Sequence, residues 1–157
     1  MSDAPEIDFG DDVDTAAFEQ ILDMDDEDDR DFSKSIVFGF LEQAETTFAK
    51  MSTALSAMSP PCAKLHHLTS SPNSKEKNLE ELSSLGHFLK GSSATLGFTK
   101  VKDECEKIQN YGHKKDETGE IDEPDEEKCL QLCKTSIMKA KSAYAAVDDL
   151  MRRYYAD

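Results

Sequence analysis

Apolar residues recur at every third or fourth position over two long stretches of the chain, and this spacing limits the fold more than any other feature. In residues 31–57 the apolar positions are Phe32, Ile36, Phe40, Ala44, Phe48, Met51 and Leu55. In residues 125–155 they are Leu130, Cys133, Ile137, Ala140, Tyr144, Val147 and Met151. This period is that of an α-helix with one apolar face. Helices of this kind bury their apolar faces against one another, so the spacing predicts an all-α protein.

The remaining chain supplies shorter helices. Its 157 residues fit one domain, and its seven glycines and five prolines are too few for a turn-rich β-protein. Besides the two long stretches, the pattern predicts helices over 13–24, 76–97 (ending near Gly97) and 99–113 (with Thr99 as N-cap). We therefore expect a four-helix up-and-down bundle, with the short helix over 13–24 laid across one end.

Charge is concentrated at the N-terminus. The chain carries a net charge of −15, and residues 1–31 hold 14 acidic residues against one basic residue, Arg30. We expect residues 1–11 to be a disordered acidic tail and residues 12–157 to be a single domain with loops at 59–75 and 114–124. The acidity argues against binding to nucleic acid or to an anionic membrane surface, because both attract lysine and arginine.

The sequence also bears on location. It has no run of 18 apolar residues, so we expect no transmembrane helix. The N-terminus lacks the basic and apolar regions of a secretory signal. The four cysteines, which include Cys62 and Cys105, are accordingly expected to be free thiols in a reducing compartment.

Three patterns suggest metal ligands, and in each the plainer interpretation is favoured. Cys129 and Cys133 are four residues apart on a helix but have no second ligand pair, so core packing is the better explanation. His66 and His67 are adjacent on a loop, which makes a poor chelate. Residues 23–34 resemble a calcium loop but lack its central glycine and end in lysine, so an acidic connector is expected instead.

The predicted helix over 76–97 places one histidine on its outer side. On a helical wheel the leucines at 82, 85, 89 and 96 cluster opposite His87, so His87 points to solvent. Lys90, Gly91 and Ala94 share its face. Glycine costs a helix about 1 kcal/mol relative to alanine. Either another molecule must approach the imidazole closely, or His87 is only an exposed polar residue and Gly91 a tolerated defect.

Residues 87–94, HFLKGSSA, closely resemble the active-site motif of histidine-containing phosphotransfer (HPt) domains. The resemblance extends to Gly97 and to CEKIQNYG at 105–112. Residues 24–51 are also similar to the fungal phosphorelay intermediates of the osmosensing pathway. Three matching segments in the same order make coincidence a poor explanation.

The resemblance implies roles for individual residues. His87 would be the phosphoacceptor, and Lys90 would offset charge on the phosphoryl group. Gln109 would help to hold the imidazole, while Gly91 and Ser92 would meet the partner. Just beyond Gln109, His113 stands where related proteins carry an arginine, which puts a fixed positive charge there in doubt.

The resemblance further implies an apolar docking patch made of Ile21, Met24, Phe32 and Ile36. The alternative for these residues is packing of the first helix on the bundle. Both interpretations stay open, because an amphipathic helix has two edges.

The implied function is that of a phosphorelay intermediate. It would take a phosphoryl group from a receiver-domain aspartate of a hybrid histidine kinase and pass it to a response-regulator aspartate. The chain has no GxGxxG or GxxxxGK loop, so ATP-dependent kinase activity of its own is not expected. It would need no cofactor, since Mg²⁺ would belong to the receiver, and it would act as a cytoplasmic and nuclear monomer. The alternative is a non-catalytic helical adaptor, which the presence of both His87 and Lys90 disfavours.

Overall fold

The computed structural model describes residues 10–26, 29–56 and 74–156, and within them the chain forms five α-helices. The helices are α1 (Thr15–Leu22), α2 (Asp31–Ser56), α4 (Ser74–Leu96), α5 (Thr99–Gly112) and α6 (Glu126–Tyr154). The four long helices begin and end within two residues of the predicted positions. The prediction of an all-α bundle is confirmed, and α1 is shorter than expected.

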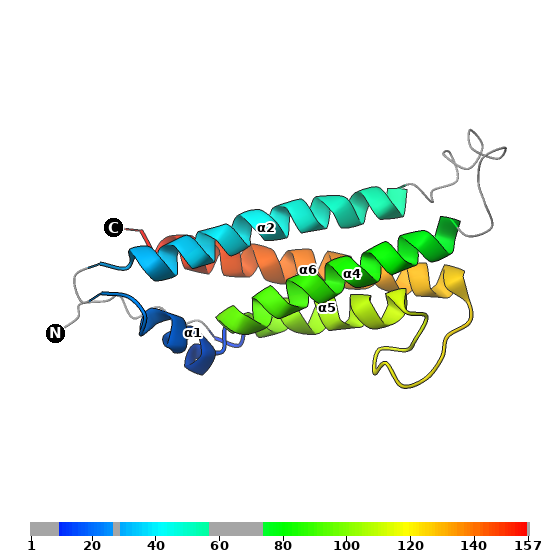
Figure 1. The fold of residues 1–157 in the computed structure, drawn as a ribbon, viewed down its shortest axis with the longest axis horizontal. Coiled ribbons are helices and arrows are strands. Elements are labelled where there is room, and N and C mark those ends of the chain that lie inside the picture. Colours follow the sequence, from blue (N-terminus) through cyan, green and yellow to red (C-terminus); the bar gives the residue numbers. More distant parts are fainter. Residues whose placement is uncertain (1–9, 27–28, 57–73, 157) are drawn as a thin grey trace.

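The four long helices alternate in direction. In Figure 1, α2 and α5 run one way along the bundle, and α4 and α6 run the opposite way. The apolar faces meet in one core. Its largest fully buried side chains are Phe18, Phe98, Leu41, Met51, Leu79, Leu82, Leu89, Leu96, Ile108, Met151, Val37 and Val101. The up-and-down bundle therefore buries the apolar faces of its four long helices against one another, and α1 adds Phe18 to the same core.

The turn between α4 and α5 holds α1 in place. Gly97 ends α4 as predicted and has a φ of +80°, which favours glycine. A Cβ at this position would lie 2.5 Å from the carbonyl oxygen of Asp14. The amide of Asp14 in turn donates to the Gly97 carbonyl at 2.6 Å. This close backbone contact fixes α1 beside the end of the bundle (Figure 1).

The N-cap predicted for α5 is wrong. Phe98 occupies the cap position without a side-chain hydrogen bond, and Thr99 is the first helical residue. The Thr99 hydroxyl donates instead to the carbonyl of Asp11 at 3.2 Å. It therefore fastens the segment that leads into α1 rather than capping its own helix.

The connector between α1 and α2 is bound to the C-terminal end of α6. Asp25 accepts a hydrogen bond from the amide of Ser33 at 2.7 Å. The Ser33 hydroxyl also donates to Asp25 and accepts from the Tyr155 hydroxyl at 2.7 Å. Arg30 donates to the Tyr154 carbonyl and lies over the rings of both tyrosines. The acidic connector is thus partly a structural element.

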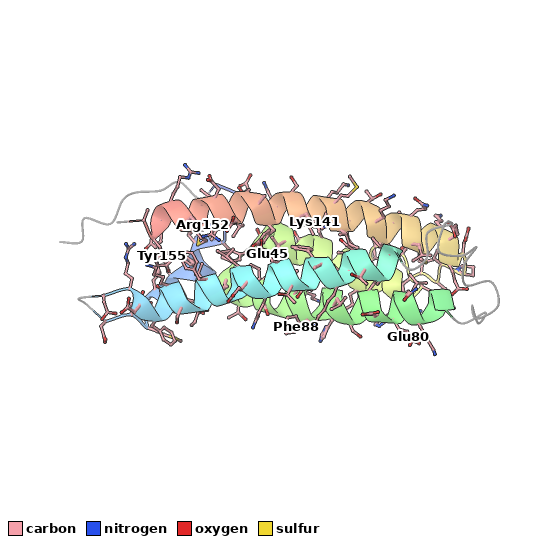
Figure 2. All side chains as sticks on the ribbon, turned by 90° about the horizontal axis from the view of Figure 1, so that it is seen from above. Glu45, Glu80, Phe88, Lys141, Arg152 and Tyr155 are labelled. Atoms are coloured by element: carbon pink, nitrogen blue, oxygen red, sulfur yellow. The ribbon has the colours of Figure 1, made fainter. Side chains whose placement is uncertain are left out.

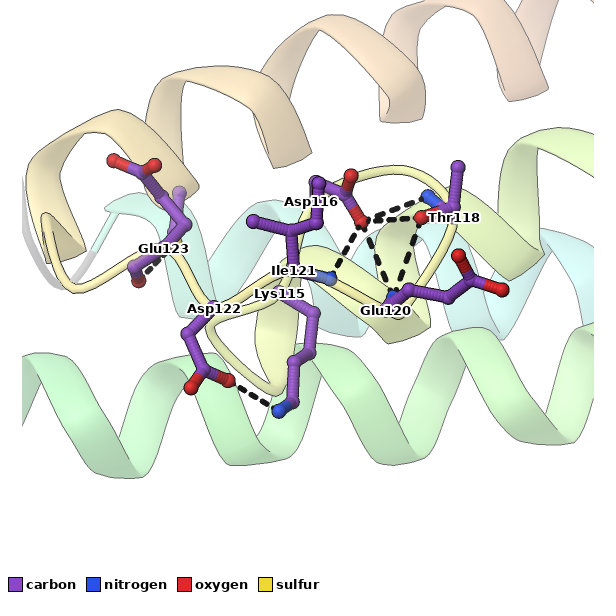
Figure 3. Close-up of polar contacts among 8 residues, drawn as sticks. Lys115, Asp116, Thr118, Glu120, Ile121, Asp122 and Glu123 are labelled. Carbon is purple, nitrogen blue, oxygen red and sulfur yellow. Dashed lines mark hydrogen bonds and ion pairs between the residues drawn. The ribbon is translucent and has the colours of Figure 1, made fainter.

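The connection between α5 and α6 is ordered by its own side chains (Figure 3). One carboxylate oxygen of Asp116 accepts from the amides of Thr118, Glu120 and Ile121 and from the Thr118 hydroxyl. These bonds lower the pKa of Asp116, the largest contribution coming from the Thr118 hydroxyl. Lys115 pairs with Asp122 across the loop.

The structure places two of the residues considered as metal ligands, Cys129 and Cys133, in the core. Both side chains are buried. The thiol of Cys129 donates to the carbonyl of Glu123, and the thiol of Cys133 donates to the carbonyl of Ile108. Among the described residues, no group of three or more His, Cys, Asp or Glu is arranged to hold a metal ion. His66, His67 and Cys62 lie outside the described residues, as do residues 1–9 of the predicted tail and most of the loop over 59–75.

Candidate functional site

The outer face of α4 carries the candidate site. His87 and Phe88 are exposed there, and Phe88 is seen at the middle of α4 in Figure 2. The leucines at 82, 89 and 96 are buried, and Leu85 is partly buried against the core. His87 therefore points outward, as the helical wheel predicts.

The imidazole of His87 has one partner from the neighbouring helix. Nε2 of Gln109, on α5, lies 3.2 Å from Nδ1 of His87. The two residues are 22 positions apart and meet only because α4 and α5 pack side by side. The direction of the hydrogen bond depends on the imidazole tautomer and on which end of the carboxamide faces the ring. In either case Nδ1 is engaged, and the contact leaves Nε2 available.

Lys90 lies one turn from His87 and also contacts α5. Its ammonium is 3.5 Å from Oε1 of Glu106, and its side chain is 33% exposed. Sequence reasoning missed Glu106. The signal for it was its position three residues before Gln109, which puts both side chains on the same face of α5. Exposed ion pairs of this kind contribute at most about 1 kcal/mol, so Lys90 is free to turn toward an incoming anion.

The other edge of α4 borders α2. Ile36 and Ser92 line one open pocket of about 350 Å³ between the two helices, together with Gln43. Phe88 and Gln43 line an adjoining pocket of about 410 Å³. The side chain of Phe88 is 49% exposed, and the sequence analysis did not single it out. The outer face of α4 thus has His87 and Lys90 toward α5 and two open pockets with both polar and apolar side chains toward α2.

The predicted docking patch is divided by the structure. Met24 and Phe32 are 62% and 44% exposed, and Ile36 is partly buried. Ile21 is only 7% exposed and belongs to the core. Its inclusion in the patch is corrected, because its side chain packs α1 onto the bundle and presents almost no surface to a partner.

Gly91 and His113 are both on the surface. A Cβ at Gly91 would have no atom within 4 Å, so nothing in the described chain requires glycine there. His113 is exposed at the C-cap of α5, where its amide bonds to the carbonyls of Gln109 and Asn110. The structure thus places His113 one turn of helix beyond Gln109.

The helical bundle and its exposed histidine lie in a part of the chain that matches a known family. Residues 36–150 match the Hpt domain. The chain belongs to the Hpt domain family. Multistep phosphorelay regulator 1 of Schizosaccharomyces pombe is 44% identical over 84% of this chain, and phosphorelay intermediate protein YPD1 of Candida albicans is 49% identical over 65% of it. The matches span 38% and 45% of those relatives' own lengths, so this Hpt chain spans less than half of each.

A solved structure extends the comparison to the whole domain. It is a co-crystal of the Saccharomyces cerevisiae histidine phosphotransfer protein Ypd1 with the receiver domain of its downstream response regulator Ssk1. It matches the Hpt domain described above with a TM-score of 0.71 and 30% identity, covering 92% of this chain and 94% of that one.

Among the described residues of this chain, no helix is both long and apolar enough to cross a membrane.

Proposed function

We propose that this protein is a phosphorelay intermediate. It accepts a phosphoryl group on His87 from a receiver-domain aspartate of a hybrid histidine kinase and passes it to an aspartate of a response regulator. The observation that carries the proposal is the exposed imidazole of His87 in an Hpt domain, with Nδ1 held by Gln109 and with Lys90 one turn away. The resemblance to fungal phosphorelay intermediates supports action as a monomer in the cytoplasm and nucleus.

The reaction is a displacement at phosphorus. In the reactive tautomer, Nδ1–H donates to the carboxamide oxygen of Gln109, which a half-turn of the amide brings to face the ring. The lone pair of Nε2 then attacks the phosphorus of the aspartyl phosphate. An N–P bond forms, the P–O bond to the aspartate breaks, and its electron pair leaves with the carboxylate. Transfer to the second receiver reverses these steps.

The two partners supply different groups. This chain provides the nucleophile and, in Lys90, a positive charge close to the phosphoryl oxygens. The receiver provides the aspartate and Mg²⁺, so the proposal assigns no cofactor to this chain. Met24, Phe32, Ile36 and Ser92 would form the docking surface, and the open space over Gly91 would admit the receiver's active site. The complex of the yeast relative with the receiver domain of Ssk1 supports a receiver domain as the partner of this chain.

The test follows one phosphoryl group through two transfers, from phosphoramidate to His87 and from His87 to a receiver domain. The chain is first phosphorylated with phosphoramidate, the remaining reagent is removed, and the Ssk1 receiver with Mg²⁺ is then added. We expect acid-labile phosphate on the wild-type chain, followed by its movement to the receiver. His87→Gln should fold normally, because the side chain is exposed, and should take up no phosphate.

The matched control replaces another exposed histidine, His113→Gln, which should keep both transfers. Phosphate uptake by His87→Gln at the wild-type level would refute the assignment of His87. Binding of the receiver without any transfer would favour the helical adaptor.

A further inference from the structure

Gly86 precedes His87 and lies where α4 meets α5. A Cβ at this position would be 2.8 Å from the carbonyl oxygen of Cys105 and 3.1 Å from the amide nitrogen of Gln109. Cβ atoms essentially never approach backbone atoms closer than 3.0 Å. The backbones of the two helices are thus in direct contact here, and only glycine allows this contact.

The contact continues along both helices as a seam of small residues. Ser83 is buried, and its hydroxyl donates to the carbonyl of Gln109 at 3.0 Å. A Cβ at Gly112 would lie 2.5 Å from the carbonyl oxygen of Leu79 and 2.7 Å from the Cβ of Ser83. On α4, Gly86 therefore lets the amide nitrogen of Gln109 approach closely, and Ser83 binds the carbonyl of the same residue.

This backbone contact determines how far the side chain of Gln109 reaches. Its carboxamide meets Nδ1 of His87 at 3.2 Å, near the upper end of the usual hydrogen-bond range. A methyl group at position 86 must move the α5 backbone away, because the atoms it would meet first belong to that backbone. A shift of a few tenths of an ångström already takes the Gln109–His87 pair beyond about 3.5 Å, where the hydrogen bond is lost.

We propose that Gly86 is a positioning residue for phosphotransfer, which acts by holding Gln109 against Nδ1 of His87. This proposal deepens the proposed function, and the expected effect of Gly86 on the rate of phosphotransfer rests on that function. Gly91 is the contrasting case: it lies on the same helix and has open space around it, so no contact among the described residues requires glycine there. The two glycines on either side of His87 thus have separate roles, Gly86 within the fold and Gly91, under the proposed function, toward the partner.

The first measurement needs no partner. ¹⁵N-labelled wild-type protein, Gly86→Ala and Gln109→Ala are compared by NMR of the imidazole nitrogens. We expect the wild type to hold one dominant neutral tautomer of His87, and both variants to show the mixed tautomers of a free imidazole. The control is Gly39→Ala in α2, a helical glycine with nothing within 4 Å of its Cβ, which should leave the His87 signals unchanged.

The second measurement is the rate of His87 phosphorylation by phosphoramidate in a double-mutant cycle. Misplacement of a group at a reacting centre by about 1 Å costs up to about a hundredfold in rate, so Gly86→Ala should lower the rate about tenfold. Because Gly86 acts through Gln109, the double variant should be no slower than Gln109→Ala alone. Additive losses, or wild-type signals in folded Gly86→Ala, would overturn the proposal.

A second variant covers the case in which Gly86→Ala does not fold. Ser83→Thr adds a methyl group to the same seam and keeps the hydroxyl, so it should shift the His87 signals in the same direction by a smaller amount. Unchanged signals in folded Ser83→Thr would also overturn the proposal. Failure of the wild type to accept phosphate would count against the proposed function alone, since the tautomer measurement stands without it.

Discussion

At the scale of single residues, the candidate site is made by contacts between helices. His87 and Lys90 both belong to α4, yet each has its polar partner on α5: Gln109 for the imidazole and Glu106 for the ammonium. In the proposed phosphotransfer, Glu106 would pair with Lys90 while no phosphoryl group is present. Because an exposed ion pair is weak, the ammonium of Lys90 could then exchange from Glu106 to the phosphoryl group.

This arrangement predicts that Lys90→Ala slows phosphotransfer without abolishing it. The change removes one electrostatic contact and leaves the nucleophile, and because Lys90 is partly exposed the loss should be nearer about tenfold than the 10²–10³ of a buried site. Rates within the complex with the Ssk1 receiver measure it. Lys128→Ala, which removes another exposed, ion-paired lysine on α6, is the control. If receiver binding collapses while the rate in the complex is unchanged, Lys90 is a docking residue instead.

At the scale of helices, the sequence was sufficient to predict the properties that depend on one helix alone. The bounds of the long helices and the outward direction of His87 follow from apolar spacing, which a single helix records in full. The burial of Ile21 could not be predicted this way, because spacing in an eight-residue helix does not say which edge meets the bundle. Gly86 was missed for a related reason. Its role depends on which residues of α5 face α4, and a helical wheel shows only the residues of its own helix.

The division of the docking patch predicts opposite results for two substitutions. Met24→Asp places a charge on an exposed apolar surface, so affinity for the Ssk1 receiver should fall about tenfold or more while the melting temperature stays near wild type. Ile21→Asp buries a charge in the core and should lower the melting temperature markedly. Met138→Asp is the control, since Met138 is 64% exposed on α6. Equal affinity for Met24→Asp and wild type would remove Met24 from the docking surface.

At the scale of the whole molecule, hydrogen bonds join the C-terminal end of α6 to the first turn of α2 and to the connector that precedes α2. Tyr155, at the C-cap of α6, reaches Ser33 in the first turn of α2, and Ser33 is held by Asp25. The connector in this network joins Met24 to Phe32, so the end of α6 supports the predicted docking surface. Burial raises the pKa of the Tyr155 hydroxyl to about 12, and it does the same for the thiols of Cys105 and Cys133.

These pKa shifts predict alkaline unfolding. The folded state keeps the groups neutral and protonated, whereas the unfolded chain releases their protons near pH 9 for the thiols and near pH 10 for the phenol. The unfolded state therefore binds fewer protons above these values, so the stability is complete below pH 9 and declines as pH rises toward 12. Urea titrations followed by circular dichroism at pH 7, 9, 10 and 11 measure this decline. Tyr155→Phe should be less stable than wild type at pH 7, because the hydrogen bond to Ser33 is lost, yet its stability should fall less steeply between pH 10 and 11. Parallel curves for the two proteins would show that Tyr155 ionises as readily in the folded protein as in the unfolded chain, and would contradict the raised pKa.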